Sequence, residues 1–216
     1  MNALLLVTLS FFGPASLDDG SLVFLENCNY FVERYTGAPI GHVAIAVNEE
    51  NDTWIYEATP GHVRRLTWND YRAELATLNS DRARKDRAPI ITWVLEPAAP
   101  LTDQQTLAMR KYLASQLDRR YSVRGIVRGK TGDGIHCAEL VAHALNATDR
   151  AEIDDCHKQS PMAILKLARG QSAVAYQPAI ERPVVEEAWC SRTWRKCTHW
   201  AVMCRWSWGE AWRYCW

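Results

Sequence analysis

The most constraining feature of this chain is a pair of short apolar segments joined by a polar turn. Segments 42–47 and 53–58 are rich in β-branched, aromatic and small apolar residues, a composition typical of strands. Residues 48–52 between them are polar and suit a turn. This spacing predicts a β-hairpin, so side chains on the two segments are expected to lie side by side.

The remaining segments predict an α+β fold. Strands are expected at 21–25, 62–66, 90–95 and 173–176, and helices at 28–35, 67–78 and 136–145 and after Thr102 and Ser160. Thr102 and Gln105 have the spacing of a capping box. The helix that follows is expected to bury a face made of Leu107, Tyr112, Leu113 and Leu117. The charged stretch 80–88 predicts a solvated loop, and the whole indicates an antiparallel sheet packed against helices.

Composition limits the class of partner. The chain has 216 residues, of which 48% are hydrophobic and 23% charged, as in an ordinary globular protein with one domain. Lys plus Arg and Asp plus Glu are equal at 25 each, so no global field attracts nucleic acid, and none is expected as a partner. We place the domain at residues 17–180.

The first residues resemble an export signal. An apolar run from Ala3 to Phe12 precedes small residues up to Ser16, which is typical of a secretory signal peptide over residues 1–16. The first basic residue is Arg34, however, so a short apolar helix or strand packed on the domain is the alternative. The run is too short to span a bilayer. We expect an exported protein of the periplasm, cell envelope or secreted fraction.

The last residues differ in composition from the domain. Residues 181–216 form a basic tail, and segment 189–216 holds seven of the ten Trp and four of the seven Cys. Such a segment could contact a membrane or cell-wall surface, stack on single-stranded nucleic acid, or form a small disulfide-bonded appendage. A disordered or non-native extension is the plain alternative.

The cysteine count is odd. In an exported protein six of the seven cysteines could pair and one would remain free. The last four cysteines lack the paired spacing of a zinc site, so no metal is expected. Cys137 is best placed to stay free, because it follows a glycine-rich stretch and begins the helix at 136–145. A helix N-terminus lowers the pKa of a thiol, and its N–H groups can stabilise an oxyanion.

His42 and Glu57 are the candidate partners of that thiol. His42 begins the first strand of the hairpin, and a neutral imidazole near a thiol can accept its proton. Glu57 lies on the second strand, where it could face the imidazole and fix its tautomer. A buried Cys, a hydrogen-bonded core His and a solvated Glu are the structural alternatives.

A family resemblance joins these residues. The chain resembles circularly permuted papain-like cysteine amidases, which include YiiX-like bacterial proteins and, more distantly, the lecithin:retinol acyltransferase group. The resemblance covers roughly residues 18–175 and rests on the order and spacing of 41–45, 54–58, 61–63 and 137–141. The last segment reads Cys-Ala-Glu-Leu-Val where the family has Cys-Ser-Glu-Leu-Val. Ser21 and Ala138 depart from the family pattern, which has an acid and a serine at these positions.

The resemblance implies a permuted papain-like fold with Cys137 as nucleophile, His42 as base and Glu57 as the acid that orients it. It also adds Tyr121, His136 and His62 as candidate substrate-binding residues. The implied activity is hydrolysis of an amide or ester in a peptide, a cell-wall peptide or a lipid amide, with no cofactor. A lipid acyltransferase or thioesterase using the same residues, or a binding module without turnover, are the alternatives.

Overall fold

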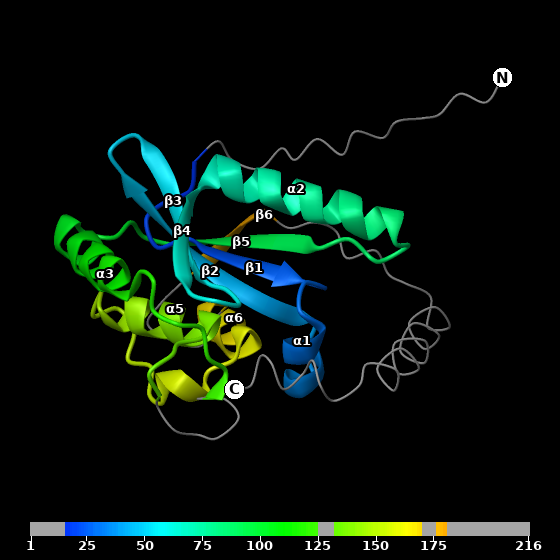
Figure 1. Ribbon diagram of the computed structural model, residues 1–216. Coiled ribbons are helices and arrows are strands. Elements are labelled where there is room, and N and C mark those ends of the chain that lie inside the picture. The colour runs from blue at the N-terminus through cyan, green and yellow to red at the C-terminus, as the bar shows by residue number, and fades with distance from the viewer. Residues whose placement is uncertain (1–15, 125–131, 170–175, 181–216) are drawn as a thin grey trace.

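The computed structural model describes residues 16–124, 132–169 and 176–180 (Figure 1). Along the chain lie β1 (Leu22–Glu26), α1 (Tyr30–Thr36), β2 (Ile40–Glu49), β3 (Asp52–Ala58), β4 (Val63–Thr67), α2 (Trp68–Arg84), β5 (Ile91–Pro97), α3 (Asp103–Gln116), α5 (Cys137–Asn146), the 3₁₀ turn η1 (Cys156–Lys158), α6 (Pro161–Ala168) and β6 (Tyr176–Ile180). The predicted segment 173–176 lies mostly outside the described residues, and the last strand begins at Tyr176.

The six strands form one sheet in the order β4-β3-β2-β1-β5-β6. Every neighbouring pair is antiparallel. The expected hairpin is present: β2 and β3 pair from Ile45–Tyr56 to Glu49–Asp52, around a turn at 50–51. The prediction of an α+β fold with an antiparallel sheet and helices is confirmed.

Helices cover both faces of the sheet (Figure 1). Helix α2 lies on one face, where Trp68, Tyr71 and Leu75 pack against alternate residues of the central strands such as Ala44 and Ile55. Helices α3, α5 and α6 lie on the other face over the larger core. The period-2 alternation of β2 divides its side chains between the two cores, because successive residues of a strand point to opposite faces.

Capping residues set where the helices begin. The Thr67 hydroxyl accepts from the Asp70 N–H at the start of α2, and Thr102 forms the expected capping box with Gln105 at the start of α3. Ser160 caps α6 with Pro161 in its first turn, the arrangement that favours a helix start. These side chains satisfy backbone N–H groups that have no partner inside the helix.

Two helix predictions were wrong in detail. Helix α2 continues to Arg84, so much of the stretch 80–88 is helical and not loop. Its charged residues are solvated along the helix, where Arg84 pairs with Asp81 one turn earlier. Leu107 was expected in the core, but it is 66% exposed, and α3 buries Thr106, Met109 and Leu113 instead.

Both chain ends lie largely outside the described residues. This applies to the proposed signal peptide, of which only Ser16 is described, and to the whole tail 181–216. None of the helices in the described ranges combines the length and apolar composition that crossing a membrane requires.

Candidate active site

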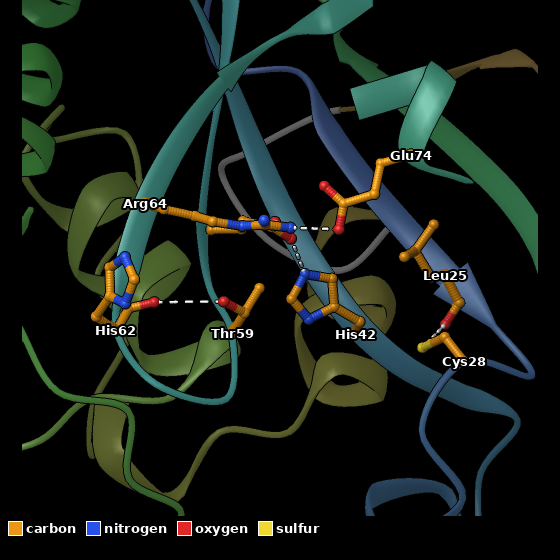
Figure 2. A network of polar contacts seen from close by, with 8 residues as sticks. Leu25, Cys28, His42, Thr59, His62, Arg64 and Glu74 are labelled. Carbon is orange, nitrogen blue, oxygen red and sulfur yellow. Dashed lines mark hydrogen bonds and ion pairs between the residues drawn. The ribbon is translucent and has the colours of Figure 1, made fainter. Parts of the chain in front are cut away.

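His42 and Glu57 meet where the β2–β3 hairpin opens. The pairing of the two strands ends at Ile45 and Tyr56, and both residues lie just beyond that last pair. His42 and Ala44 share one face of β2 by alternation, and Glu57 lies on the neighbouring strand near them. His42 Nε2 is 2.7 Å from Glu57 Oε2, and the Glu57 side chain is only 3% exposed. Figure 2 shows the His42 ring with Arg64 and Glu74 nearby.

A bulge immediately before His42 shapes this end of β2. Leu25 of β1 pairs with His42, whereas Glu26 pairs with Ile40, which leaves Gly41 as the extra residue. A Cβ at Gly41 would lie 2.9 Å from the backbone N of Asn29, at the start of α1. Glycine is therefore needed here, because the N-terminus of α1 packs directly against the bulge. Bulges of this kind re-aim side chains next to functional sites.

A second set of backbone contacts brings Cys137 to the same end of the sheet. Val63 of β4 exchanges hydrogen bonds with the 118–119 segment, and Tyr121 N–H donates to the Gly61 carbonyl. The neighbouring residues 120–122 in turn bond to both sides of Ile135. A Cβ at Gly134 would lie 2.3 Å from that of Ser122, so glycine permits this close crossing. Two residues after Ile135, the chain enters α5 at Cys137.

Cys137 is the first residue of α5 and is 3% exposed. The first backbone N–H groups of a helix have no intrahelical partner. The Glu139 N–H donates to His136 Nδ1 at 3.2 Å. The N–H groups of Cys137 and Ala138 come before that of Glu139 in the helix. They are therefore placed to stabilise negative charge beside the sulfur.

The thiol of Cys137 and the imidazole of His42 shift each other's pKa in opposite directions. Burial raises the pKa of Cys137, but hydrogen bonds and charges from His136 and His42 outweigh burial and lower the pKa to about 6. Burial lowers the pKa of His42, but hydrogen bonds to Cys137 and Glu57 outweigh burial and raise it. The geometry thus favours a thiolate beside an imidazolium. Because Nε2 is occupied by Glu57, Nδ1 is the ring nitrogen of His42 left for the sulfur.

Glu57 stays ionised despite its burial. Burial raises the pKa of its carboxyl group, but the hydrogen bond and charge of His42 and those of Arg64 outweigh burial and lower it. An ionised Glu57 only accepts hydrogen bonds, so His42 Nε2 must carry a proton. In the neutral imidazole, Nδ1 is then the unprotonated nitrogen, which is the tautomer that a base for the thiol requires.

His136 also lies beside Cys137, but its ring nitrogens are committed to the backbone. Nδ1 accepts the Glu139 N–H, and Nε2 lies 3.0 Å from the His157 carbonyl oxygen, to which it can only donate. Burial lowers the pKa of His136, but Cys137, the His157 carbonyl and Glu139 together outweigh burial and raise it. Protonation at Nδ1, however, would destroy the cap. Both histidines lower the pKa of the Cys137 thiol, but only His42 has a ring nitrogen that neither the backbone nor a carboxylate occupies.

The other two predicted substrate-binding residues lie on the backbone path that leads to Cys137. Tyr121 is half-buried, forms an isolated parallel bridge with Ile135 and packs partly on the larger core. His62 is exposed and forms an antiparallel bridge with Arg120. Its carbonyl accepts from the Thr59 hydroxyl (Figure 2). Tyr121 is thus bridged to the residue two before Cys137, and His62 to the neighbouring Arg120.

The other described thiols contrast with Cys137. Cys28, Cys137 and Cys156 are free, whereas the last four cysteines lie outside the described residues. Burial raises the pKa of Cys28, and burial likewise raises the pKa of Cys156. Cys137 is thus the one described thiol with a lowered pKa.

Two charged residues at the site were not anticipated from the sequence. Arg64 of β4 donates to Glu57, and Glu74 of α2 accepts from Arg64. Glu57 and Arg64 are direct cross-strand partners in the β3–β4 register. Counting residues across the turn at 59–62 could have found Arg64, but the pairing with Glu74 depends on how α2 lies over the sheet.

Within the ranges that the structure describes, no cluster of three or more His, Cys, Asp or Glu side chains could hold a metal ion. No family model matches the chain. No curated protein matches it either. Among solved structures the chain is similar to a crystal structure of the metalloprotein YiiX from Escherichia coli O157:H7. That likeness has a TM-score of 0.47 and 15% identity, and covers 76% of this chain and 89% of the other. A likeness this distant assigns neither a site nor an activity to this chain.

Proposed function

We propose that the protein is a cysteine hydrolase that cleaves an amide or ester bond, with Cys137 as nucleophile, His42 as base and Glu57 as the acid that orients His42. One observation carries the proposal: Glu57 occupies Nε2 of His42, so the opposite nitrogen is left for the Cys137 thiol. The lowered pKa of that thiol supports the same assignment. A nucleophile, a base and an orienting group in this order are the arrangement that acyl transfer needs.

The first half of the reaction forms an acyl-enzyme. His42 holds the proton of Cys137, and the thiolate attacks the carbonyl carbon, so a C–S bond forms and the carbonyl π electrons move to oxygen. The N–H groups of Cys137 and Ala138 are placed to stabilise this oxyanion. The oxyanion then collapses, the C–N or C–O bond breaks, and His42 protonates the leaving amine or alcohol. A thioester on Cys137 remains.

The second half regenerates the enzyme. His42, now neutral, removes a proton from water while the water oxygen attacks the thioester carbon. The C–S bond breaks with its electron pair going to sulfur, and the acid product leaves. His42 keeps the proton beside the restored thiolate, and Glu57 stabilises the imidazolium throughout. No cofactor takes part in either half.

We further propose that the fold is the circularly permuted papain-like fold. Its support is the chain order, in which the strand with His42 precedes the helix that begins at Cys137, and the position of that cysteine at a helix N-terminus. The proposed substrates are peptides, cell-wall peptides and lipid amides, and the proposed location is the cell envelope or outside the cell. A lipid acyltransferase or thioesterase would use the same three residues.

Thiol labelling and a substrate panel test the proposal. The full chain is treated with iodoacetamide at pH 6, and peptide mass spectrometry follows the rates of Cys137 and Cys156. We expect Cys137 to react on the order of 100-fold faster, because about half of its thiol is ionised at that pH, whereas burial keeps the Cys156 thiol protonated. Peptidoglycan fragments, acyl-amino acids and phospholipids are then assayed with the wild type, Cys137→Ala and the control Cys156→Ala.

The expected result is turnover of one substrate class by the wild type and the control, with none by Cys137→Ala. Equal labelling of the two thiols, together with no effect of His42→Ala, would show a binding module and not an enzyme.

A further inference from the structure

The Glu57 carboxylate has two sides with different partners. Its Oε2 atom faces His42, whereas Oε1 accepts from Arg64 Nε at 2.8 Å and lies 2.7 Å from Nη2 of the same guanidinium. The same Nη2 donates to Glu74 Oε1 at 2.8 Å (Figure 2). A continuous chain of polar contacts therefore runs from His42 through Glu57 and Arg64 to Glu74.

The backbone fixes this chain of contacts. Glu57 and Arg64 are opposite each other in the β3–β4 ladder, so their side chains share one face of the sheet. Glu74 reaches the same face from α2, the helix that covers it. Exposure rises along the series, from 3% for the Glu57 side chain to 31% for Arg64 and 42% for Glu74. The buried carboxylate is thus linked to the surface by one arginine.

The ionisation of Glu57 decides which tautomer His42 adopts. A protonated Glu57 could donate to His42 Nε2, and the imidazole proton would then lie on Nδ1, facing the sulfur. In that state the histidine could no longer accept the thiol proton. A buried carboxylate without a cation tends toward this neutral form, and an adjacent guanidinium opposes it.

We propose that Arg64 is a positioning residue of this site: it keeps Glu57 ionised with Oε2 turned to His42, and Glu74 holds Arg64 in place. This inference rests on the proposed cysteine hydrolase function and deepens it. Arg64 acts through Glu57 and does not touch the sulfur. The two N–H groups of the guanidinium that converge on Oε1 leave the other carboxylate oxygen for His42, a geometry that a single ammonium group does not reproduce.

Other titratable groups face this part of the sheet. Tyr71 of α2 lies near Glu57, Arg64 and Glu74, and burial raises the pKa of its phenol well above the usual value, so it stays neutral. Its hydroxyl has no hydrogen-bond partner among the described residues. Cys28, which precedes α1, also has a raised pKa and stays a thiol at neutral pH. Arg64 is therefore the charged group that opposes protonation of Glu57 from this side, with His42 on the other.

The test measures the iodoacetamide labelling rate of Cys137 against pH in Arg64→Gln, Arg64→Lys and Glu74→Gln. We expect the acid limb of the Arg64→Gln profile to move to higher pH by about one unit, which is about tenfold slower labelling at pH 5.5. Arg64→Lys keeps the positive charge, so its Cys137 labelling rate should fall only about threefold. The labelling rate of Glu74→Gln should fall only about twofold, because Glu74 is partly solvated and acts through Arg64.

Arg65→Gln is the matched control. Arg65 is the next residue of β4 and points to the opposite face, where it donates to Glu49 and lies over the Trp54 ring. The same substitution there should leave the labelling profile of Cys137 unchanged. A second readout is the ¹⁵N spectrum of the His42 ring, which reports whether the proton lies on Nε2 or Nδ1. We expect Nε2 in the wild type and a shift toward Nδ1 in Arg64→Gln at acid pH.

The outcomes separate the two hypotheses. If wild-type Cys137 reacts no faster than Cys156, the proposed function fails and the positioning role fails with it. If wild-type Cys137 is activated and Arg64→Gln has the wild-type profile and tautomer, only the role of Arg64 is overturned, and a fall in melting temperature would then mark it as structural. If Arg64→Gln does not fold, Arg64→Lys and Glu74→Gln decide by the same readouts, and unchanged profiles in both overturn the proposal.

Discussion

Two histidines flank Cys137, and the two sides of the site use them differently. On the strand side, His42 has one nitrogen held by Glu57 and one left for the sulfur. On the helix side, His136 has both nitrogens engaged, one by the Glu139 N–H and one by the His157 carbonyl. Both rings lie beside the same thiol, and a carboxylate lies near each. The hydrogen-bond partners of the ring nitrogens, more than their distance from the thiol, distinguish the proposed base His42 from the helix cap His136.

The largest expected effect comes from removing the strand-side histidine. In the wild type, the Cys137 pKa of about 6 means that labelling by iodoacetamide rises through pH 6 and levels off above it. In His42→Ala, the thiol loses its partner and labelling should rise only near the ordinary thiol pKa of about 8.5. The rate at pH 6 should therefore fall roughly 100-fold. His136→Asn serves as the control, and its labelling rate at pH 6 should fall by less than about threefold.

If the labelling rate fell by a similar factor in both variants, the two histidines would contribute equally to activating the thiol, which would contradict the distinction drawn between them. Intact-protein mass spectrometry at several pH values gives both rates, and circular dichroism checks that each variant is folded.

The strand-side carboxylate should have the next largest effect. Glu57→Gln keeps the size of the side chain but removes its charge, and it can present an amide donor to His42 Nε2. We expect about tenfold slower labelling of Cys137 at pH 6, since one adjacent opposite charge shifts a pKa by at least about one unit. Glu49→Gln is the control, because Glu49 is bonded to Tyr56 and Arg65 at the far end of the hairpin. Labelling at the wild-type rate in Glu57→Gln would remove Glu57 from the site.

The helix-side histidine should matter for stability. His136→Ala removes the N-cap of α5 and should cost about 1 kcal/mol of unfolding free energy, a typical loss for a cap. In His136→Asn the side-chain oxygen can accept the same backbone N–H, so this variant should regain most of the lost unfolding free energy. Urea denaturation of the three proteins measures the difference. Equal stability of His136→Ala and the wild type would contradict the capping role.

The smallest effect should come from the helix-side carboxylate. Glu139 is buried, and its Oε2 lies 3.6 Å from His136 Nε2, beyond an ordinary hydrogen bond. Glu139→Gln should change the Cys137 labelling rate by less than about threefold, because the capping bond of His136 goes to the backbone N–H and not to the carboxylate. An effect as large as that of Glu57→Gln would make the two sides equivalent and refute the comparison.

Much of the sheet could be predicted because its signals are local. The polar turn between two strand-like segments predicts the hairpin, and Thr102 with Gln105 fixes the start of α3. The end of α2 could not be read in the same way. A solvated helix needs no apolar stripe, so the charged residues up to Arg84 resemble a loop in sequence. Leu107 was misplaced because helical spacing does not say which side of a helix meets the core.

The candidate site likewise contains residues that local sequence signals predict and residues that depend on contacts between distant segments. His42 and Glu57 follow from the hairpin, since two neighbouring strands bring their side chains together. The approach of Cys137 depends on the crossing at Gly134, a contact between segments that lie apart in sequence. The cap made by His136 and the guanidinium of Arg64 were also missed. Both depend on side-chain directions that only the assembled structure defines.

The order of the three residues along the chain has a consequence for protein synthesis. Glu57 is made 15 residues after His42, whereas Cys137 follows Glu57 by 80 residues. The ribosome therefore releases the hairpin well before the nucleophile, and chains fold from the N-terminus as they emerge. Cys137 leaves the ribosome as an ordinary thiol of low reactivity. Under the proposed function it becomes a thiolate only when α5 docks beside strands β1 to β5, and β6 follows later in the chain.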